Sequence, residues 1–487
     1  ATASQPEWTW RRVALLFLGT WLAICGGTLY AFSSFEVELM KLCQLSARKL
    51  DAVYAAGQLG AGVGIIPGAI YDHRGPVATS LYGLVLTVLG NLGLAWALRE
   101  ESCGGVYILA FSYWMLQNGS VALYQVGLFS NMRAASATSQ GMVTGIVCSG
   151  FGLSAAFWTL LYADVFGENL DRYFKGTAIV FGATAAFAAV ALPRLLTREP
   201  GVKPYGRLDE DGSESPAASS PDTVTYGRQV ASSSQSKAPC CDQLSDQPAS
   251  SPSLRQILCN LDLWLFLAVF CLLQGVGSGL FIANLSLIAT SLEIPASSRL
   301  RYVRLVSYCN FGGRLVTGFL MDFWEPRGVQ RSDHLLWTSS GLILISGGLF
   351  LAPEAALPHV LLPALLVIAF CYGSNWAIMP SFLESRFHGA HVGVTFNLNT
   401  GGLGLAVLGV SYVVGSLHDA AATLQSPAAG SPSLPDESGF CLGASCWRNA
   451  FQLGGLAAIL GLAGALALSC SESSRQRRSS LKAGSSY

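Results

Sequence analysis

The residue with the clearest chemical potential is Arg314, a cation in the middle of an apolar stretch at 303–323. An isolated arginine in the middle of a membrane helix costs about 2.5–3.5 kcal/mol on insertion scales. Its planar guanidinium can bind a carboxylate through two parallel hydrogen bonds, which a lysine cannot reproduce. We therefore expect Arg314 to bind a carboxylate. Pairing with backbone carbonyls, or with Asp322 or Asp72, is the alternative.

Other polar side chains also fall within apolar runs, and we expect them to orient the molecule that Arg314 binds. They are Tyr30, Gln117, Tyr124, Gln274, Asn310, Tyr372, Asn375 and Asn397. For any single Asn or Gln, a hydrogen bond between helices is the alternative explanation. The sequence has no P-loop, no paired CxxC motif and no pairing of a nucleophile with a base. It therefore predicts no enzyme activity, no metal and no cofactor.

The composition indicates which elements must hold these side chains. The 487 residues are 51% hydrophobic and 12% charged, whereas soluble domains average about 25% charged residues. So few charges cannot cover the surfaces of the several soluble domains that a chain of this length would form. The sequence therefore predicts a polytopic all-α protein embedded in a lipid bilayer. The net charge of zero gives no indication of nucleic-acid binding.

Apolar runs of membrane-spanning length predict twelve transmembrane helices. They are 13–34, 51–71, 77–98, 105–131, 139–163, 174–193, 262–290, 299–322, 334–352, 358–383, 389–417 and 447–469. We expect an N-terminal six-helix bundle at 1–196, a disordered linker at 197–253, a C-terminal six-helix bundle at 254–470 and a basic tail at 471–487.

Charge and cysteine placement predict the orientation in the membrane. The side that holds both termini and the linker is richer in Lys and Arg, which indicates the cytosol. The membrane itself is either the plasma membrane or that of an organelle. Cys441 and Cys446 lie in a polar loop on the other side, where an oxidising compartment would favour a disulfide. Two unpaired thiols are the alternative.

A repeated motif divides the chain into two halves. Gly68-x-x-x-Asp72 follows the second predicted span, with Arg74 and Gly75 just after it, and Gly318-x-x-x-Asp322 ends the eighth. The glycine allows close helix packing, and the aspartate can cap a helix or pair with an arginine. Recurrence at matching places indicates two related halves with a binding site near the membrane midplane.

These features together resemble the major facilitator superfamily, and the resemblance covers nearly the whole chain. Within it, the chain is similar to the nodulin-like group and to the oxalate–formate antiporter and monocarboxylate transporter types. The motifs concerned are Tyr30-Ala-Phe-Ser33, the stretch 50–75, Asn131-Met-Arg133 before Gly141-x-x-x-Gly145, Asn310-Phe-Gly-Gly-Arg314, Val394-Thr-Phe-Asn397 and Cys441-x4-Cys446. The resemblance implies two pseudo-symmetric six-helix bundles, transport by alternating access and a cytosolic Gly-x-x-x-Asp motif.

The same resemblance bears on the substrate. Monocarboxylate and oxalate carriers have an arginine on span eight with a glycine four residues later, as Arg314 and Gly318 are here. Monocarboxylate transporters place an aspartate where this chain has Asn310, which argues against aspartate-based proton coupling. Oxalate carriers add a lysine on span eleven, and residues 401–415 contain none. We therefore expect a singly charged organic anion, with a monocarboxylate the favoured case and protons a candidate coupling ion.

Two other functions stay open from the sequence. One is a carrier for amino acids or another neutral or zwitterionic nutrient, in which Arg314 would hold the α-carboxylate. The other is a transporter-like receptor or scaffold that signals through the linker at 197–253.

Overall fold

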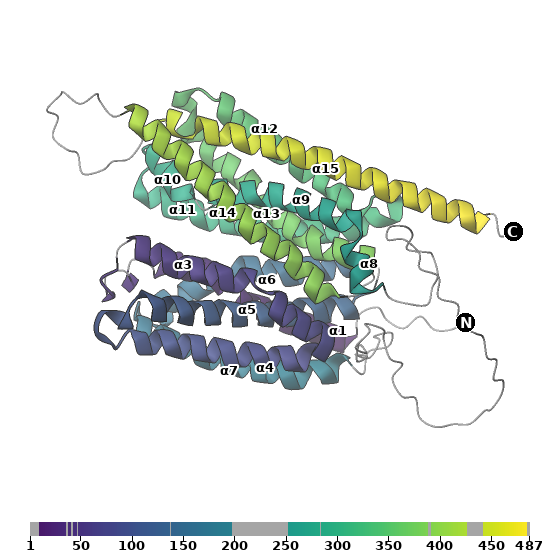
Figure 1. Cartoon of the computed structure of the whole chain (residues 1–487), viewed down its shortest axis with the longest axis horizontal. Helices are drawn as coiled ribbons and strands as arrows, with labels where there is room; N and C mark the ends of the chain where they lie inside the picture. The colour runs from purple at the N-terminus through teal and green to yellow at the C-terminus, as the bar shows by residue number, and fades with distance from the viewer. Residues whose placement is uncertain are drawn as a thin grey trace.

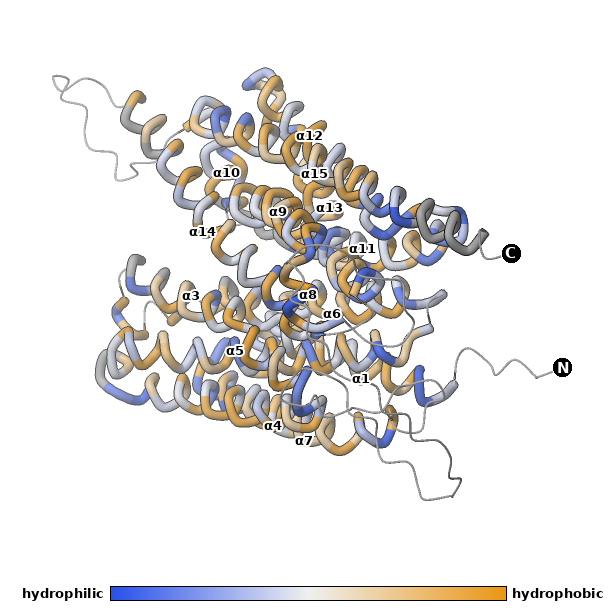
Figure 2. The backbone as a smooth tube through the Cα atoms, turned by 45° about the vertical axis from the view of Figure 1, so that its right-hand side comes forward, coloured by the Kyte–Doolittle hydropathy of each residue, from blue (hydrophilic) through white to orange (hydrophobic). Residues whose placement is uncertain are grey.

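The computed structural model describes residues 9–196, 252–425 and 442–484, apart from 36–37, 40–41, 46, 137, 283 and 388–390. Throughout these residues the regular secondary structure is helical, which confirms the all-α prediction. By length and composition alone, eight helical segments among them can cross a membrane, and one of these, Ala52–Ala97, holds two predicted spans. Figure 2 shows that hydrophobic residues predominate along the helices.

The two halves of the chain form two groups of helices, drawn in purple to blue and in teal to yellow in Figure 1. The N-terminal group contains α1 (Trp10–Gly26), η1 (Thr28–Ser34), α3 (Ala47–Gly62), α4 (Ile65–Ala97), η2 (Glu101–Gly104), α5 (Val106–Ala134), α6 (Gln140–Leu160), η3 (Leu161–Val165) and α7 (Leu170–Leu196).

The C-terminal group begins with α8 (Leu254–Leu258), α9 (Leu261–Gly275), η4 (Val276–Ile282), α10 (Leu285–Ser291) and α11 (Ala296–Trp324). It continues with η5 (Glu325–Arg327), η6 (Arg331–Asp333), α12 (His334–Leu351), η7 (Glu354–Ala356), α13 (Leu357–Phe387), α14 (Val392–Gln425) and α15 (Ser445–Gly484). The start of α1 and the end of α15 lie at the same end of the molecule (Figure 1), which we call the termini face.

Several predicted spans are broken or extended. The predicted second span, 51–71, breaks between α3 and α4, where Gly62 and Gly64 weaken the helix. The chain then stays helical up to a turn at Gly75, whose φ of 76° suits glycine. The predicted seventh span, 262–290, is divided into α9, the π-helical η4 and α10.

The ends of the two bundles also differ from expectation. Helix α15 continues to Gly484, well beyond the predicted span 447–469 and through much of the predicted tail. Almost all of the predicted linker, 197–251, lies outside the described residues.

The bundles touch through glycines, whose lack of a side chain lets backbones approach closely. A methyl group at Gly318 on α11 would lie 2.5 Å from the carbonyl oxygen of Gly141 on α6. At Gly68 on α4 it would lie 2.5 Å from the carbonyl oxygen of Gly393, near the start of α14. These two contacts bring the bundles together in the half of the molecule nearest the termini face.

A disulfide that the sequence analysis did not predict joins Cys43 to Cys103, at the face opposite the termini. It connects the segment before α3 to η2, just before α5, across a sequence separation of 60 residues. Cys446, at the start of α15, is also disulfide-bonded. Cys441 lies outside the described residues, so its pairing with Cys446 stays a prediction.

Candidate functional site

The aspartate of the first Gly-x-x-x-Asp motif caps a helix of the other bundle. Asp72 accepts hydrogen bonds from the backbone N–H groups of Gly393 and Val394, each at 2.9 Å. These N–H groups belong to the first turn of α14, where no carbonyl of the same helix can accept from them. The negative charge also interacts favourably with the positive end of the helix dipole.

The aspartate of the second motif makes the matching contact in the opposite direction. Asp322 on α11 accepts from the N–H groups of Gly141 at 2.7 Å and Met142 at 2.6 Å, in the first turn of α6. Arg331 lies 3.9 Å from the same carboxylate. Each aspartate therefore holds the opposite bundle at the termini face, instead of capping the next helix along the chain.

The remaining motif residues shape the chain around these caps. Gly75 makes the left-handed turn after Asp72, and Arg74 is exposed. His391 lies just before α14, and burial together with the nearby His73 lowers the pKa of its imidazole. His391 is therefore neutral near pH 7, beside the helix end that Asp72 caps.

Arg314 lies where α11 meets α6, and its side chain is 1% exposed. Its Nε donates to Oδ1 of Asn310, one turn earlier on α11, at 3.0 Å. Its Nη1 donates to the backbone carbonyl of Cys148 on α6, also at 3.0 Å. Its Nη2 is buried and has no hydrogen-bond partner among the described residues. The arginine thus connects the bundles and keeps one donor unused.

Aromatic rings cover the guanidinium. Its Cζ lies 5.6 Å from the ring centroid of Phe151 on α6 and 5.6 Å from that of Trp376 on α13. Such cation–π contacts stabilise a cation without supplying a negative charge. The indole Nε1 of Trp376 is also buried without a partner among the described residues. A second unused donor therefore lies close to Arg314.

Three predicted tyrosines belong to this cluster. The hydroxyls of Tyr30 on η1 and Tyr372 on α13 are 3.2 Å apart and join the two bundles. The ring centroid of Tyr30 is 5.5 Å from that of Phe151, and that of Tyr124 is 4.9 Å from it. The hydroxyl of Tyr124 also lies 3.3 Å from Sγ of Cys148.

Gln274 and Asn375 are attached to the same cluster through α13. Gln274 Nε2 donates to the carbonyl of Tyr372 at 3.2 Å, and Asn375 Nδ2 lies 3.5 Å from Gln274 Oε1. Oδ1 of Asn375 is buried and has no partner among the described residues. An unused acceptor therefore accompanies the two unused donors.

The other two predicted residues make their hydrogen bonds elsewhere. Gln117 Oε1 accepts from the hydroxyl of Thr28 at 3.4 Å, within the N-terminal bundle. Asn397 on α14 accepts from Gln125 of the opposite bundle at 2.7 Å and donates to Gly393 at 2.6 Å. Asn397 therefore contributes to the contact between α14 and the N-terminal bundle.

Two groups of α6 contact Arg314. The bond to the Cys148 carbonyl is a backbone pairing of the kind that the sequence left open as the alternative, although it did not identify Cys148. The Phe151 ring was not predicted. Gly145, Cys148 and Phe151 are spaced three residues apart, so they follow one side of the helix. Gly145 packs against α11, since a methyl group there would lie 2.8 Å from the Arg314 carbonyl oxygen. This spacing could have indicated which residues of α6 face Arg314.

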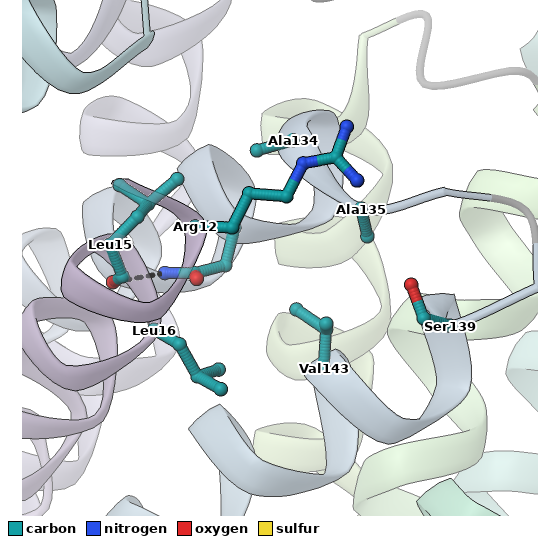
Figure 3. Close-up of a pocket in the computed structure, with 8 residues that line it drawn as sticks. Arg12, Leu15, Leu16, Ala134, Ala135, Ser139 and Val143 are labelled. Carbon is teal, nitrogen blue, oxygen red and sulfur yellow. Dashed lines mark hydrogen bonds between the residues drawn. The ribbon is translucent and has the colours of Figure 1, made fainter. Parts of the chain in front are cut away.

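A small pocket at the termini face lies within the N-terminal bundle (Figure 3). Its lining includes Arg12, Leu15 and Leu16 of α1 and Val143 of α6. Asn131 of α5 donates to the Leu15 carbonyl at 3.0 Å. The pocket is lined by one bundle only, so it is separate from the contact where Arg314 lies. In the described part of the chain, no cluster of His, Cys, Asp and Glu could hold a metal ion.

Several relatives match nearly the full length of the chain. Protein NUCLEAR FUSION DEFECTIVE 4 of Arabidopsis thaliana is 21% identical over 94% of this chain and 88% of its own length. Apicoplast pyruvate carrier 1 of Toxoplasma gondii is 24% identical over 85% of this chain and 84% of its own.

Solved structures with similar folds are also transporters. A bacterial homologue of the iron transporter ferroportin, in an outward-facing state, has a TM-score of 0.64 at 13% identity, over 95% of this chain and 100% of that one. The transporter FucP, in the outward conformation, has a TM-score of 0.56 at 14% identity, over 92% and 98% of the two chains. At such identities these similarities establish the fold alone.

A match to a protein-family model identifies the family of the chain, which the structural similarities alone do not. The model of the Major Facilitator Superfamily matches residues 16–410. Together with the structural neighbours, this match confirms the predicted fold of twelve transmembrane helices in two six-helix bundles. The chain belongs to the Major Facilitator Superfamily and is an integral membrane transporter.

Proposed function

We propose that this transporter moves a small organic anion, with a monocarboxylate the favoured substrate, and that Arg314 binds the carboxylate. The unused Nη2 of Arg314 carries the proposal, because it is a buried cationic donor at the contact between the bundles. In alternating access the bundles rock about a central site. A substrate held there by groups of both bundles would be exposed first to one side of the membrane and then to the other.

The charge of the site supports a single negative charge on the substrate. Arg314 is the one cationic side chain in the cluster described above, and its polar neighbours Asn310, Tyr30 and Tyr372 are neutral. Residues 401–415 on α14 add no lysine or arginine. A second carboxylate would therefore be buried without a positive partner, which is strongly unfavourable. The Toxoplasma gondii relative is named a pyruvate carrier, and pyruvate is a monocarboxylate.

The neutral groups have distinct proposed roles. Asn310 orients the guanidinium through its bond to Nε. The hydroxyls of Tyr30 and Tyr372 can turn to donate to a carboxylate, and Trp376 Nε1 is a further free donor. Gln274 fixes the α13 backbone at Tyr372. Tyr124 lies further back, against Cys148 and Phe151.

A second candidate substrate, an amino acid, is supported by one observation. Asn375 Oδ1 is a buried acceptor without a partner among the described residues. An ammonium group could donate to it while Arg314 holds the α-carboxylate. An amino acid carries this ammonium donor and a monocarboxylate does not, so direct competition between the two substrate classes can distinguish them.

We also propose that the termini face lies in the cytosol. Disulfides persist mainly in oxidising compartments. The Cys43–Cys103 bond and the disulfide-bonded Cys446 both lie at the face opposite the termini. This placement agrees with the charge bias of the sequence and favours the plasma membrane or a membrane of the secretory pathway.

Uptake into proteoliposomes tests the proposed substrate. Labelled pyruvate, lactate, oxalate and alanine would be offered to the purified, reconstituted protein. We expect uptake of pyruvate or lactate, no uptake of oxalate, and no inhibition by excess alanine. Uptake of alanine that resists excess lactate would instead establish the amino acid alternative.

A further inference from the structure

We propose that an anionic phospholipid binds in a groove between α1 and α7, on the surface of the N-terminal bundle that faces the bilayer. The groove has a volume of about 550 Å³, and ligand sites typically measure about 300–1,000 Å³. Its lining includes Ala14, Phe17 and Trp21 of α1 and Ala183 and Phe187 of α7. The inference goes beyond the proposed function, since this groove differs from the contact between the bundles and from the pocket in Figure 3.

The groove results from small side chains among large ones on two membrane helices. Ala14 and Ala183 leave space, and Phe17, Trp21 and Phe187 form the walls around it. Both phenylalanines are exposed. Exposed apolar surface on helices of membrane-spanning length marks contact with lipid. An acyl chain can therefore enter the groove directly from the bilayer.

A hydrogen bond between the two helices fixes the inner end of the groove. Nε1 of Trp21 donates to Oγ1 of Thr184 at 3.0 Å. The indole also packs edge-on against the ring of Phe157 on α6, with the ring centroids 5.5 Å apart. Because both contacts hold the indole in place, the wall is already ordered before a lipid binds. Binding then loses little free energy to the ordering of side chains.

The outer end of the groove lies at the termini face. Helix α1 begins there (Figure 1), and α7 returns to it because α6 starts at the same face. Arg11 precedes Trp21 by ten residues, and Arg194 likewise follows Thr184 by ten. Ten residues of α-helix measure about 15 Å, half of a hydrocarbon core about 30 Å thick. The groove therefore extends through one leaflet, which is the depth that a phospholipid occupies.

The side chains at the outer end suit a negatively charged headgroup. Arg194 is exposed in the last turn of α7, seven residues after Phe187 and on the same side of the helix. Cζ of Arg11 lies 5.4 Å from the ring centroid of the exposed Trp10, and tryptophan is typical of the headgroup level. Residues 10–26 and 176–196 contain no aspartate or glutamate. These stretches carry only positive charge, which attracts anionic lipid.

A phospholipid matches both parts of this site. Its phosphate would lie between Arg11 and Arg194, and one acyl chain would lie against Phe17 and Phe187. A free phosphate would use only the charged end, and an uncharged lipid would use only the apolar groove. The two parts together predict that an anionic headgroup binds roughly tenfold more tightly than a zwitterionic one with the same chains.

Native mass spectrometry of the purified full-length protein tests this preference. The delipidated protein would be mixed with phosphatidylserine or with phosphatidylcholine that carries the same two acyl chains. We expect phosphatidylserine to be retained at a concentration about tenfold lower than phosphatidylcholine. Equal retention of the two lipids would overturn the proposal.

Two variants separate the headgroup contact from the chain contact. Arg11→Gln combined with Arg194→Gln should abolish the preference and leave the binding of phosphatidylcholine as it was. Ala183→Trp fills the groove from an exposed position, and it should weaken the binding of both lipids by about tenfold or more. Arg172→Gln is the matched control, because Arg172 is exposed at the other end of α7, and it should retain the wild-type preference.

The variants also define the results that would contradict the proposal. If the double arginine variant kept the preference, or if Arg172→Gln lost it equally, the headgroup would not bind at this end of the groove. Undiminished lipid binding by Ala183→Trp would exclude the groove itself. The melting temperature of each variant in detergent checks its folding. The headgroup and chain variants alter different parts of the site, so either one tests the proposal if the other does not fold.

Discussion

Replacing Asp322 by asparagine should open the termini face. The carboxylate accepts from two N–H groups of α6, Gly141 at 2.7 Å and Met142 at 2.6 Å. An asparagine keeps one acceptor oxygen, loses the charge, and turns its NH₂ toward the second N–H group. The change leaves α11 intact, so its effect is concentrated on the contact between the bundles.

The magnitude follows from these two bonds. A hydrogen bond to a charged group contributes about 1.5–3 kcal/mol, and a charge at a helix end about 0.3–2 kcal/mol. Since one neutral bond remains, we expect the closed state to lose about 2 kcal/mol. That loss corresponds to a roughly 30-fold shift toward the state that is open at the termini face.

Native cysteines report this shift. Cys148 on α6 is buried and its backbone carbonyl accepts from Arg314 of the opposite bundle, whereas Cys470 near the end of α15 is exposed. Alkylation by N-ethylmaleimide, resolved for each cysteine by mass spectrometry, should become up to about 30-fold faster at Cys148 in Asp322→Asn and stay unchanged at Cys470.

Asp171→Asn is the control for this experiment, because Asp171 pairs with Lys175 and Arg99 inside one bundle. It should leave the alkylation of Cys148 at the wild-type rate. If Asp322→Asn behaved like this control, the aspartate caps would not hold the bundles together and our interpretation of the motif would be wrong.

Three further changes have defined outcomes. Gly318→Ala should destabilise the closed state by about 1–3 kcal/mol and accelerate the alkylation of Cys148. Gly312→Ala on the same helix is its control, because a methyl group there meets nothing within 4 Å, and it should have neither effect. Tyr372→Phe removes the hydroxyl that lies 3.2 Å from the hydroxyl of Tyr30. It should weaken pyruvate binding by less than about tenfold, measured by calorimetry. Cys43→Ser breaks the bond to Cys103 and should lower the free energy of unfolding by about 2–5 kcal/mol, measured by thermal denaturation, without changing the substrate taken up.

Most of the fold could be predicted because membrane-spanning helices are recognisable in a sequence as long apolar runs. Apolar runs located the spans, and the repeated Gly-x-x-x-Asp motif divided them into halves. The breaks at Gly64 and in η4 were missed, since a glycine within an apolar run does not by itself indicate whether a helix ends there. The Cys43–Cys103 bond was missed because its two cysteines are 60 residues apart in sequence.

The site was predicted in part. The isolated charge of Arg314 and its spacing from Asn310 are visible in the sequence, and the structure joins the two by a hydrogen bond. The carbonyl of Cys148 is backbone, so no residue type could indicate it. The partners of Asp72 lie more than 300 residues away, with a separation of 321 to Gly393. Such contacts depend on how the two bundles dock.

The central claim is that Arg314 binds the substrate carboxylate, and uptake by arginine variants tests it most directly. Labelled pyruvate would be offered to proteoliposomes with the wild-type protein, Arg314→Lys, Arg314→Gln, and Arg304→Gln as a control at an exposed position of the same helix. Loss of a buried charged partner is worth about 2–5 kcal/mol. We therefore expect the glutamine variant to lose at least about 30-fold in pyruvate uptake, the lysine variant to fall well below wild type, and the control to retain it. Normal uptake by both Arg314 variants would contradict the account.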